Sequence, residues 1–156
     1  RMNRTKNIAV VGTGGGGTID SRIIEAACEV GREIAAQKWT LICGGLGGVM
    51  EAASRGASEN GGVVIGILPG YGHSDGNPYL DFVIPTGLGH ARNAVIAAAS
   101  EGMVAVGGSH GTISEVALAL KMGKPVAAIL FPAAVEGVIS VSTPQEAITA
   151  LKNRFA

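Results

Sequence analysis

A short stretch of glycines and hydroxyl residues stands where a buried segment of the chain meets an amphipathic one. The apolar run 103–106 is followed by GGSHGT at 107–112, and then by an apolar-faced helical pattern that includes Glu115. A strand that enters a helix through a glycine turn presents free backbone N–H groups and the positive end of the helix dipole at one place. That arrangement suits a phosphate group or another small anion.

Two further glycine turns follow apolar segments, at 14–17 after the segment 7–12 and at 44–48 after the segment 39–43. Three such turns carry a cost in conformational entropy that a fold alone does not require, so we interpret them as ligand-binding. The residues predicted to bind a ligand are Gly14, Gly15, Gly16, Gly44, Gly45, Gly48, Arg92, Asn93, Gly107, Gly108, Ser109, His110, Gly111, Thr112 and Glu115.

For several polar and charged residues near these turns, a purely structural role is an alternative to ligand binding. Arg92 lies near a predicted helix start, where the dipole disfavours a cation, and this favours an anionic partner over an exposed helix charge. Thr112 and Glu115 have the T-x-x-E spacing of a capping box, which would explain both without any ligand. His110 has equal claims to contact a ligand or solvent, whereas His73 and His90 are interpreted as ordinary loop residues.

Several common site motifs are missing from the sequence. The segment 39–43 ends in Cys43-Gly44, where a dinucleotide site would place a ribose-binding carboxylate. No glycine turn carries the lysine of a nucleotide-triphosphate loop, and the histidines, cysteines and acidic residues show no metal-ligand spacing. We therefore expect neither a dehydrogenase, nor a nucleoside triphosphatase, nor a metal site.

Apolar runs and helical patterns alternate along the chain, which predicts an α/β fold. The runs are uncharged and continuous, as in parallel strands buried on both faces. We expect a Rossmann-like, doubly wound, mainly parallel sheet with helices on both faces, as a single domain over residues 1–156. Strands are expected at 7–12, 39–43, 63–68, 80–84, 103–106 and 125–130, with a weaker one at 138–141, and helices at 21–37, after 48, up to about 100, after 112 and after 143.

The composition limits the classes of partner. The 156 residues include 12 Lys+Arg and 12 Asp+Glu, so the formal net charge is zero, which disfavours a nucleic-acid binder. With 47% hydrophobic and only 15% charged residues, we expect a homo-oligomer, a dimer or tetramer. No segment is suited to cross a membrane or to act as a signal peptide, and Cys28 and Cys43 are expected to be buried free thiols in the cytoplasm.

Three motifs together resemble those of the LOG-like Rossmann family, long mislabelled as lysine decarboxylases. They are Gly107-Gly108-x-x-Gly111-Thr112-x-x-Glu115, Arg92-Asn93, and Gly44-Gly45-x-x-Gly48-x-Met50. The usual family signature is P-G-G-x-G-T-x-x-E with an arginine on the preceding helix. This chain differs from the signature in having two residues, where the family has one, between the second and third glycines. Val106 stands in the place of the proline, and Asn93 follows the arginine where the hydrolases of the family have lysine.

Within that superfamily, the short, glycine-rich sequence with A-R-N looks closer to the molybdenum-cofactor carrier proteins than to the hydrolases. The resemblance implies a carrier or storage protein whose ligand bears a phosphate group and is either molybdopterin or a nucleoside monophosphate. It implies no cofactor that would be required for catalysis. The alternative is a nucleoside 5′-monophosphate phosphoribohydrolase of the cytokinin-activating type, in which Arg92 and Glu115 would be catalytic. A third possibility is an interaction module whose apolar helices serve only assembly.

Overall fold

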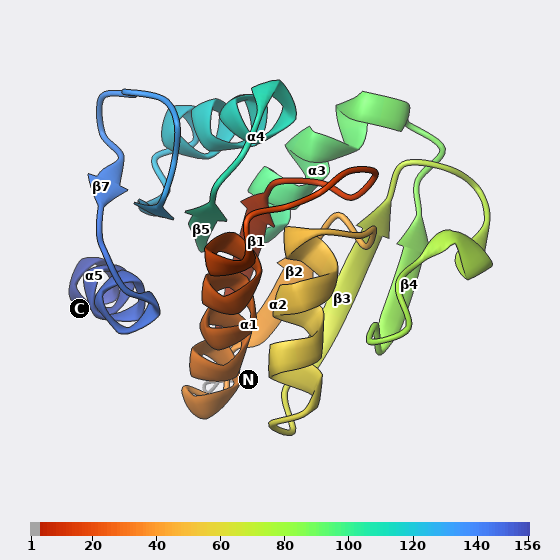
Figure 1. The fold of residues 1–156 in the computed structure, drawn as a ribbon, viewed down its shortest axis with the longest axis horizontal. Helices are drawn as coiled ribbons and strands as arrows, with labels where there is room; N and C mark the ends of the chain where they lie inside the picture. Colours follow the sequence, from red (N-terminus) through yellow and green to blue (C-terminus); the bar gives the residue numbers. More distant parts are fainter. Residues whose placement is uncertain (1–3) are drawn as a thin grey trace.

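The structure is a computed structural model, and it describes residues 4–156. Strands and helices alternate along the chain as predicted (Figure 1). The strands are β1 Asn7–Gly12, β2 Thr40–Cys43, β3 Val63–Leu68, β4 Phe82–Pro85, β5 Gly102–Val106, β6 Val126–Ile129 and β7 Ile139–Ser140. The helices are α1 Ser21–Ala36, α2 Val49–Ser58, α3 Arg92–Ala99, α4 His110–Lys121 and α5 Pro144–Phe155, with short 3₁₀ turns at His73–Asp75 and Gly89–Ala91.

All neighbouring strands in the described chain pair in parallel, in the order β4-β3-β2-β1-β5-β6-β7. The order reverses direction between β1 and β5, which is the topological switch point of the sheet. Because parallel strands share one carboxyl edge, the turns after β2, β1 and β5 lie next to one another. The predicted convergence of the three glycine turns at one edge is therefore confirmed.

Alternate residues of β1, β2, β3, β5 and β6 enter two separate cores, one on each face of the sheet. Ile8 and Val10 of β1 pack with α1, α2 and α5, whereas Ala9 and Val11 pack with α3 and α4. Burial on both faces explains why the strands are continuous apolar runs without polar alternation. The doubly wound, Rossmann-like α/β fold is confirmed.

Helix ends follow the capping signals where the sequence carries clear ones. Asp20 caps α1, because its side chain accepts a hydrogen bond from the Arg22 N–H at 2.9 Å. At α5, Thr143 Oγ1 accepts from the Glu146 N–H at 3.1 Å, while the Glu146 carboxylate accepts from the Ser142 N–H at 2.9 Å. The Thr143 half of the predicted capping box and the proline at the first helical position are confirmed, but the Glu146 carboxylate binds the N–H one residue before the cap, so the reciprocal half is not formed.

The region between β3 and α3 differs from the prediction. The fourth strand begins at Phe82 and includes Pro85, whereas residues 80–84 were expected. Leu80 precedes the strand and packs against the core that α1, α2 and α5 form with the sheet. Pro85 is tolerated because β4 is the edge strand of the sheet, where a missing N–H leaves no ladder partner unpaired.

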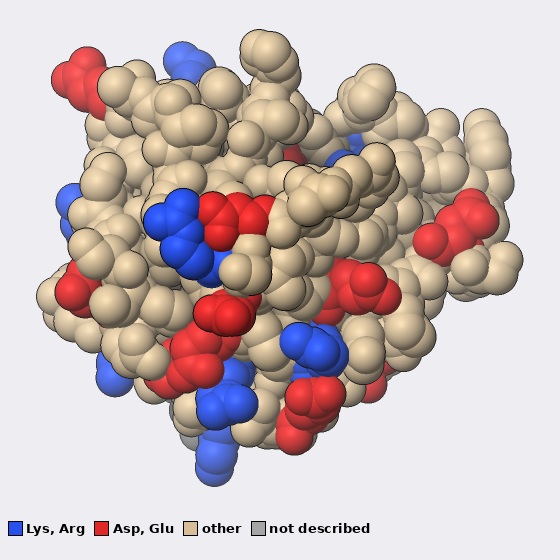
Figure 2. Space-filling model, viewed as in Figure 1, with Lys and Arg blue, Asp and Glu red and all other residues tan. Residues whose placement is uncertain are grey.

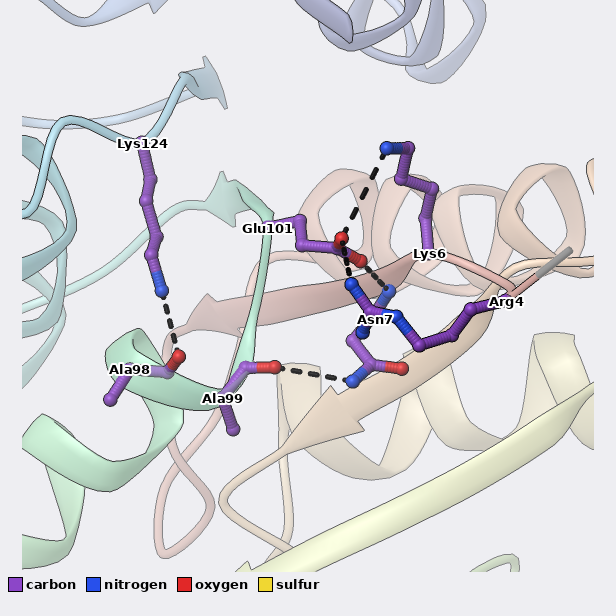
Figure 3. A network of polar contacts seen from close by, with 7 residues as sticks. All are labelled: Arg4, Lys6, Asn7, Ala98, Ala99, Glu101 and Lys124. Atoms are coloured by element: carbon purple, nitrogen blue, oxygen red, sulfur yellow. Dashed lines mark hydrogen bonds and ion pairs between the residues drawn. The ribbon is translucent and has the colours of Figure 1, made fainter. Parts of the chain in front are cut away.

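At the amino edge of the sheet, Glu101 ties the first described residues to the start of β5 (Figure 3). Its carboxylate accepts hydrogen bonds from the Arg4 guanidinium at 3.1 Å and from the Asn7 N–H at 2.9 Å. Lys124 Nζ donates to the Ala98 carbonyl at 2.8 Å, at the carboxyl end of α3, where a cation is favoured by the helix dipole. These contacts are structural and lie at the opposite edge from the glycine turns.

Acidic and basic side chains are mixed over α1 and α2, and the rim above them carries few charges (Figure 2). Among residues 4–156, no helix is long and apolar enough to cross a membrane, and no three His, Cys, Asp or Glu side chains gather as metal ligands would. Both cysteines are free, but only Cys43 is fully buried. The expectation that Cys28 is buried too was wrong, because its helix leaves it partly open to solvent.

Candidate functional site at the carboxyl edge of the sheet

Most backbone N–H groups of the turn after β5 already donate to acceptors elsewhere in the protein. Gly107 and Gly108 adopt φ values of +61° and +133°, which side chains rarely tolerate. The Gly107 N–H donates to the Ile129 carbonyl at 2.9 Å, and the Gly108 N–H donates to Thr13 Oγ1 at 3.0 Å. These two glycines therefore shape the turn and join it to the loop after β1, and their N–H groups already have acceptors.

Helix α4 begins at His110, earlier than the sequence pattern suggested. Ser109 is the residue before the helix, and its N–H donates to Thr112 Oγ1 at 3.2 Å. The structural alternative of a capping box formed by Thr112 and Glu115 was wrong, because Thr112 is already the third residue of the helix. The N–H groups of His110 and Gly111, the first two helical residues, have no acceptor within the helix.

A small cavity, named here the α4 cavity, opens at this helix start and has a volume of about 170 Å³. It brings together residues from the loop after β1, from α3 and from α4. The predicted residues that line it are Gly14, Arg92, Asn93, Ser109, Gly111, Thr112 and Glu115. It is also lined by Val11, Gly12, Met50 and His90, which were not predicted to bind a ligand.

Arg92 is held firmly inside the protein. Its side chain is buried, and its guanidinium donates to the carbonyls of Ile67 at 2.9 Å and Gly44 at 3.2 Å and to the side-chain oxygen of Asn93. The alternative of an exposed helix charge was therefore wrong. A Cβ on Gly44 would lie 2.5 Å from the guanidinium, so a side chain there would displace Arg92 from its present position.

Glu115 faces the same cavity from α4 and is only 8% exposed. Burial raises the pKa of its carboxyl to about 7, and the positive charge of Arg92 opposes this rise. Burial also lowers the pKa of the Arg92 guanidinium, an effect opposed by the Glu115 charge. No ion pair within 4.0 Å joins the two in the described structure, so they interact across the cavity.

The remaining predicted residues lie around the cavity, in different roles. Gly45, in the turn after β2, has φ +78° and lies against the Leu68 side chain. Gly16 and His110 are exposed and line neither this cavity nor its neighbour. Gly15 and Gly48 line the neighbouring cavity instead.

This neighbouring cavity, named here the α2 cavity, has a volume of about 510 Å³ and lies between the loop after β1 and α2. Its polar lining residues, Glu51, Arg55 and Tyr79, were missed by sequence reasoning. They carry no motif, since two belong to an ordinary amphipathic helix and the third to an irregular loop. His90 of the α4 cavity was missed too, although its position two residues before Arg92 was a usable signal.

Fold and site together define a class: a Rossmann-like protein whose small-molecule cavities lie at the topological switch point, beside a helix N-terminus. Residues 5–154 match the model of the SLOG cluster4 family, so the chain belongs to that family. The resemblance seen in the sequence is confirmed.

Solved structures of the same class are similar over nearly their whole length. The molybdenum cofactor binding protein of the phototrophic bacterium Rippkaea orientalis superposes with a TM-score of 0.91 at 35% identity, covering 98% of this chain and 99% of its own. The molybdenum cofactor carrier protein MCP of Chlamydomonas reinhardtii gives a TM-score of 0.88 at 37% identity, with coverage of 97% and 99%.

Two sequence relatives complete the comparison. An uncharacterized protein of Archaeoglobus fulgidus is 45% identical over 138 residues, which are 88% of this chain and 91% of that protein. A probable cytokinin riboside 5′-monophosphate phosphoribohydrolase of rice, LOGL9, is 35% identical over 95 residues. That match covers 59% of this chain and only 42% of the rice protein.

Proposed function

We propose that this protein is a carrier or storage protein for a phosphate-bearing small molecule of the molybdopterin class. The observation that carries the proposal is the α4 cavity, a space of about 170 Å³ that Gly111, in the first turn of α4, and the buried, positively charged Arg92 both line. The similarity to a molybdenum cofactor binding protein and a molybdenum cofactor carrier protein supports the same ligand class.

The phosphate group is expected at the start of α4, where the helix dipole and two N–H groups favour negative charge. Arg92 would supply longer-range positive charge, since three of its donor interactions are taken by Ile67, Gly44 and Asn93. The Thr112 hydroxyl accepts a hydrogen bond from the Ser109 N–H and so stabilises the start of the helix. The site thus binds with backbone groups that its side chains position.

The test is binding of molybdopterin released from a molybdenum enzyme, measured by titration calorimetry under anaerobic conditions, beside native mass spectrometry of the purified protein. Saturable binding, or a co-purified pterin mass, supports the proposal. Silence toward molybdopterin, ribose 5-phosphate and nucleoside monophosphates alike would remove it.

An enzymatic function is the second candidate, and Glu115 is the observation that favours it. A buried carboxyl with a pKa of about 7 in a cavity is suited to general acid and base catalysis at neutral pH. In that case Glu115 would stabilise positive charge at the ribose of a nucleoside 5′-monophosphate, or activate water. Release of adenine from AMP, lost in Glu115→Gln, would establish this activity; binding without release favours the carrier.

We also propose that the protein is a cytoplasmic homo-oligomer. Phe82 and Ile84 of the edge strand β4 are 59% and 47% exposed, and Leu88 beyond them is 52% exposed. Phe82 pairs with Ile65 and Ile84 with Ile67, so both point to the face that α3 only partly covers. A second copy would bury this patch, and light scattering of the purified protein would give the monomer mass if the proposal is wrong.

A further inference from the structure

The α4 cavity is too small to hold a whole pterin or nucleotide. Cavities that enclose ligands of that size usually measure ~300–1,000 Å³. At about 170 Å³ the α4 cavity has room for a phosphate group and its immediate surroundings, whereas the α2 cavity, at about 510 Å³, falls within the usual range. A ligand anchored at α4 therefore needs a second place for its ring system.

The two cavities lie on either side of one thin loop. Gly14 lines the α4 cavity and the next residue, Gly15, lines the α2 cavity. The loop lies directly on the start of α2, because the Val49 N–H donates to the Thr13 carbonyl at 2.8 Å and a Cβ on Gly48 would collide with that same carbonyl. Figure 1 shows this loop passing above the N-terminus of α2. Because Gly14 and Gly15 have no side chains, a single ligand can extend across this loop and occupy both cavities.

The lining of the α2 cavity combines apolar walls with planar polar groups. Ile19, Ile24 and Ala52 contribute the apolar surface. Tyr79 contributes a ring, and Arg55 contributes a guanidinium that donates to Cys28 Sγ on α1 at 3.8 Å. Aromatic rings and guanidinium planes both stack on flat heterocycles.

Glu51 is the one acidic side chain of this lining. It lies in the first turn of α2 and is partly buried, and in the described structure it takes part in none of the ion pairs within 4.0 Å. An ionised carboxylate has two oxygens that only accept hydrogen bonds. It therefore matches a ring edge with two adjacent N–H donors, and it repels an edge that presents an acceptor.

From this lining we infer that the α2 cavity is the seat of a 2-amino-4-oxopyrimidine ring, as found in pterins and guanine, and that Glu51 selects it by accepting from its two donor groups. Adenine presents a ring nitrogen acceptor on the corresponding edge and is disfavoured. The inference rests on the proposed binding of a phosphate-bearing ligand at α4, and it adds the residue that selects the ring.

The test compares three probes by titration calorimetry: ribose 5-phosphate, AMP and GMP. GMP is expected to bind at least about tenfold more tightly than either other probe, the effect of one hydrogen-bonded charge. Glu51→Gln is expected to bring GMP to the affinity of AMP and to leave ribose 5-phosphate unchanged. Glu59→Gln, an exposed carboxylate at the other end of α2, is the matched control and should alter none of the three.

The outcomes separate the two proposals. Ribose 5-phosphate binding without a preference for GMP, or a preference that survives Glu51→Gln, overturns the ring seat and leaves the anion site standing. Silence toward all three probes overturns both. Circular dichroism of each variant checks that the fold is intact.

Discussion

The two cavities on either side of the loop after β1 are built in opposite ways, and their arginines show the difference. Arg92 in the α4 cavity is buried and fixed by two backbone carbonyls and Asn93. Arg55 in the α2 cavity is exposed and has a single weak contact, to a cysteine sulfur. One cavity is rigid before any ligand arrives, and the other has side chains that can adjust.

This division suits a ligand with a constant end and a variable end. Phosphate recognition benefits from fixed donors, because groups that do not reorganise on binding cost no ordering entropy. Ring recognition by exposed side chains can change by single substitutions without disturbing the fold. We therefore expect related proteins with different ligands to differ mainly at the α2 cavity, and variants of the two cavities to behave differently.

The largest expected effect comes from exchanging the two arginines for methionine in separate variants. Arg92→Met removes the donors to Gly44 and Ile67 and leaves the Glu115 carboxylate without its nearest cation, which is expected to lower the free energy of unfolding by about 3–5 kcal/mol. Arg55→Met should leave the unfolding transition nearly unchanged. Urea unfolding at pH 8, where Glu115 is ionised, measures both, and equal losses would contradict the comparison.

The next effect is the pH dependence that Glu115 imposes on stability. The folded protein holds this proton up to a pKa of about 7, whereas the ordinary value is 4.5, so unfolding releases a proton between these limits. The stability that the protonated Glu115 contributes is therefore full below pH 4.5, is lost as the pH rises toward 7, and is absent above it. The difference of about 2.5 pKa units amounts to about 3 kcal/mol.

Glu115→Gln removes the titrating group and should flatten the stability profile between pH 4.5 and 7 relative to the wild type. Binding of sulfate, an anion that does not titrate in this range, is expected to weaken above pH 7 in the wild type only, because the ionised carboxylate then opposes it. A sulfate affinity that is independent of pH in both proteins would show that Glu115 does not face the anion.

Much of the fold could be predicted from the sequence, and so could the meeting of three glycine turns. Parallel strands bring every strand end to one edge, so finding GGSHGT and the glycines at 14–17 and 44–48 after apolar runs was sufficient. The inward orientation of the Arg92 side chain could not be predicted. Its hydrogen-bond acceptors are the carbonyls of Ile67 and Gly44, which belong to a strand and a turn far from it in the sequence.

The start of α4 and the α2 cavity were missed for different physical reasons. Glycine at 111 is a poor helix former, so the helix seemed to begin after it, but the Thr112 hydroxyl on the Ser109 N–H stabilises an earlier start. Glu51 and Arg55 read as ordinary surface residues of α2. They become a cavity lining only because the loop after β1 and Tyr79 lie opposite them.

A smaller effect is expected from Gly108→Ala. Its φ of +133° strains any side chain, and a Cβ there would lie 2.7 Å from the Thr112 side chain, so the start of α4 must shift. We expect a loss of about 1–3 kcal/mol in stability and roughly tenfold weaker ribose 5-phosphate binding, the loss of one charge-assisted hydrogen bond. Gly17→Ala, with no atom within 4 Å of its Cβ, is the control and should keep both properties.

The smallest effect compares two threonines that each accept one backbone hydrogen bond at a helix start. Thr112 accepts from the Ser109 N–H at 3.2 Å beside the α4 cavity, and Thr143 accepts from the Glu146 N–H at 3.1 Å at α5. Valine at either position should lower stability by about 1 kcal/mol, as for other lost caps. Only Thr112→Val should also weaken ribose 5-phosphate binding, because only there does the freed turn carry the anion donors. If both variants bind ribose 5-phosphate as the wild type does, the start of α4 is a structural cap and the anion is held elsewhere in the cavity.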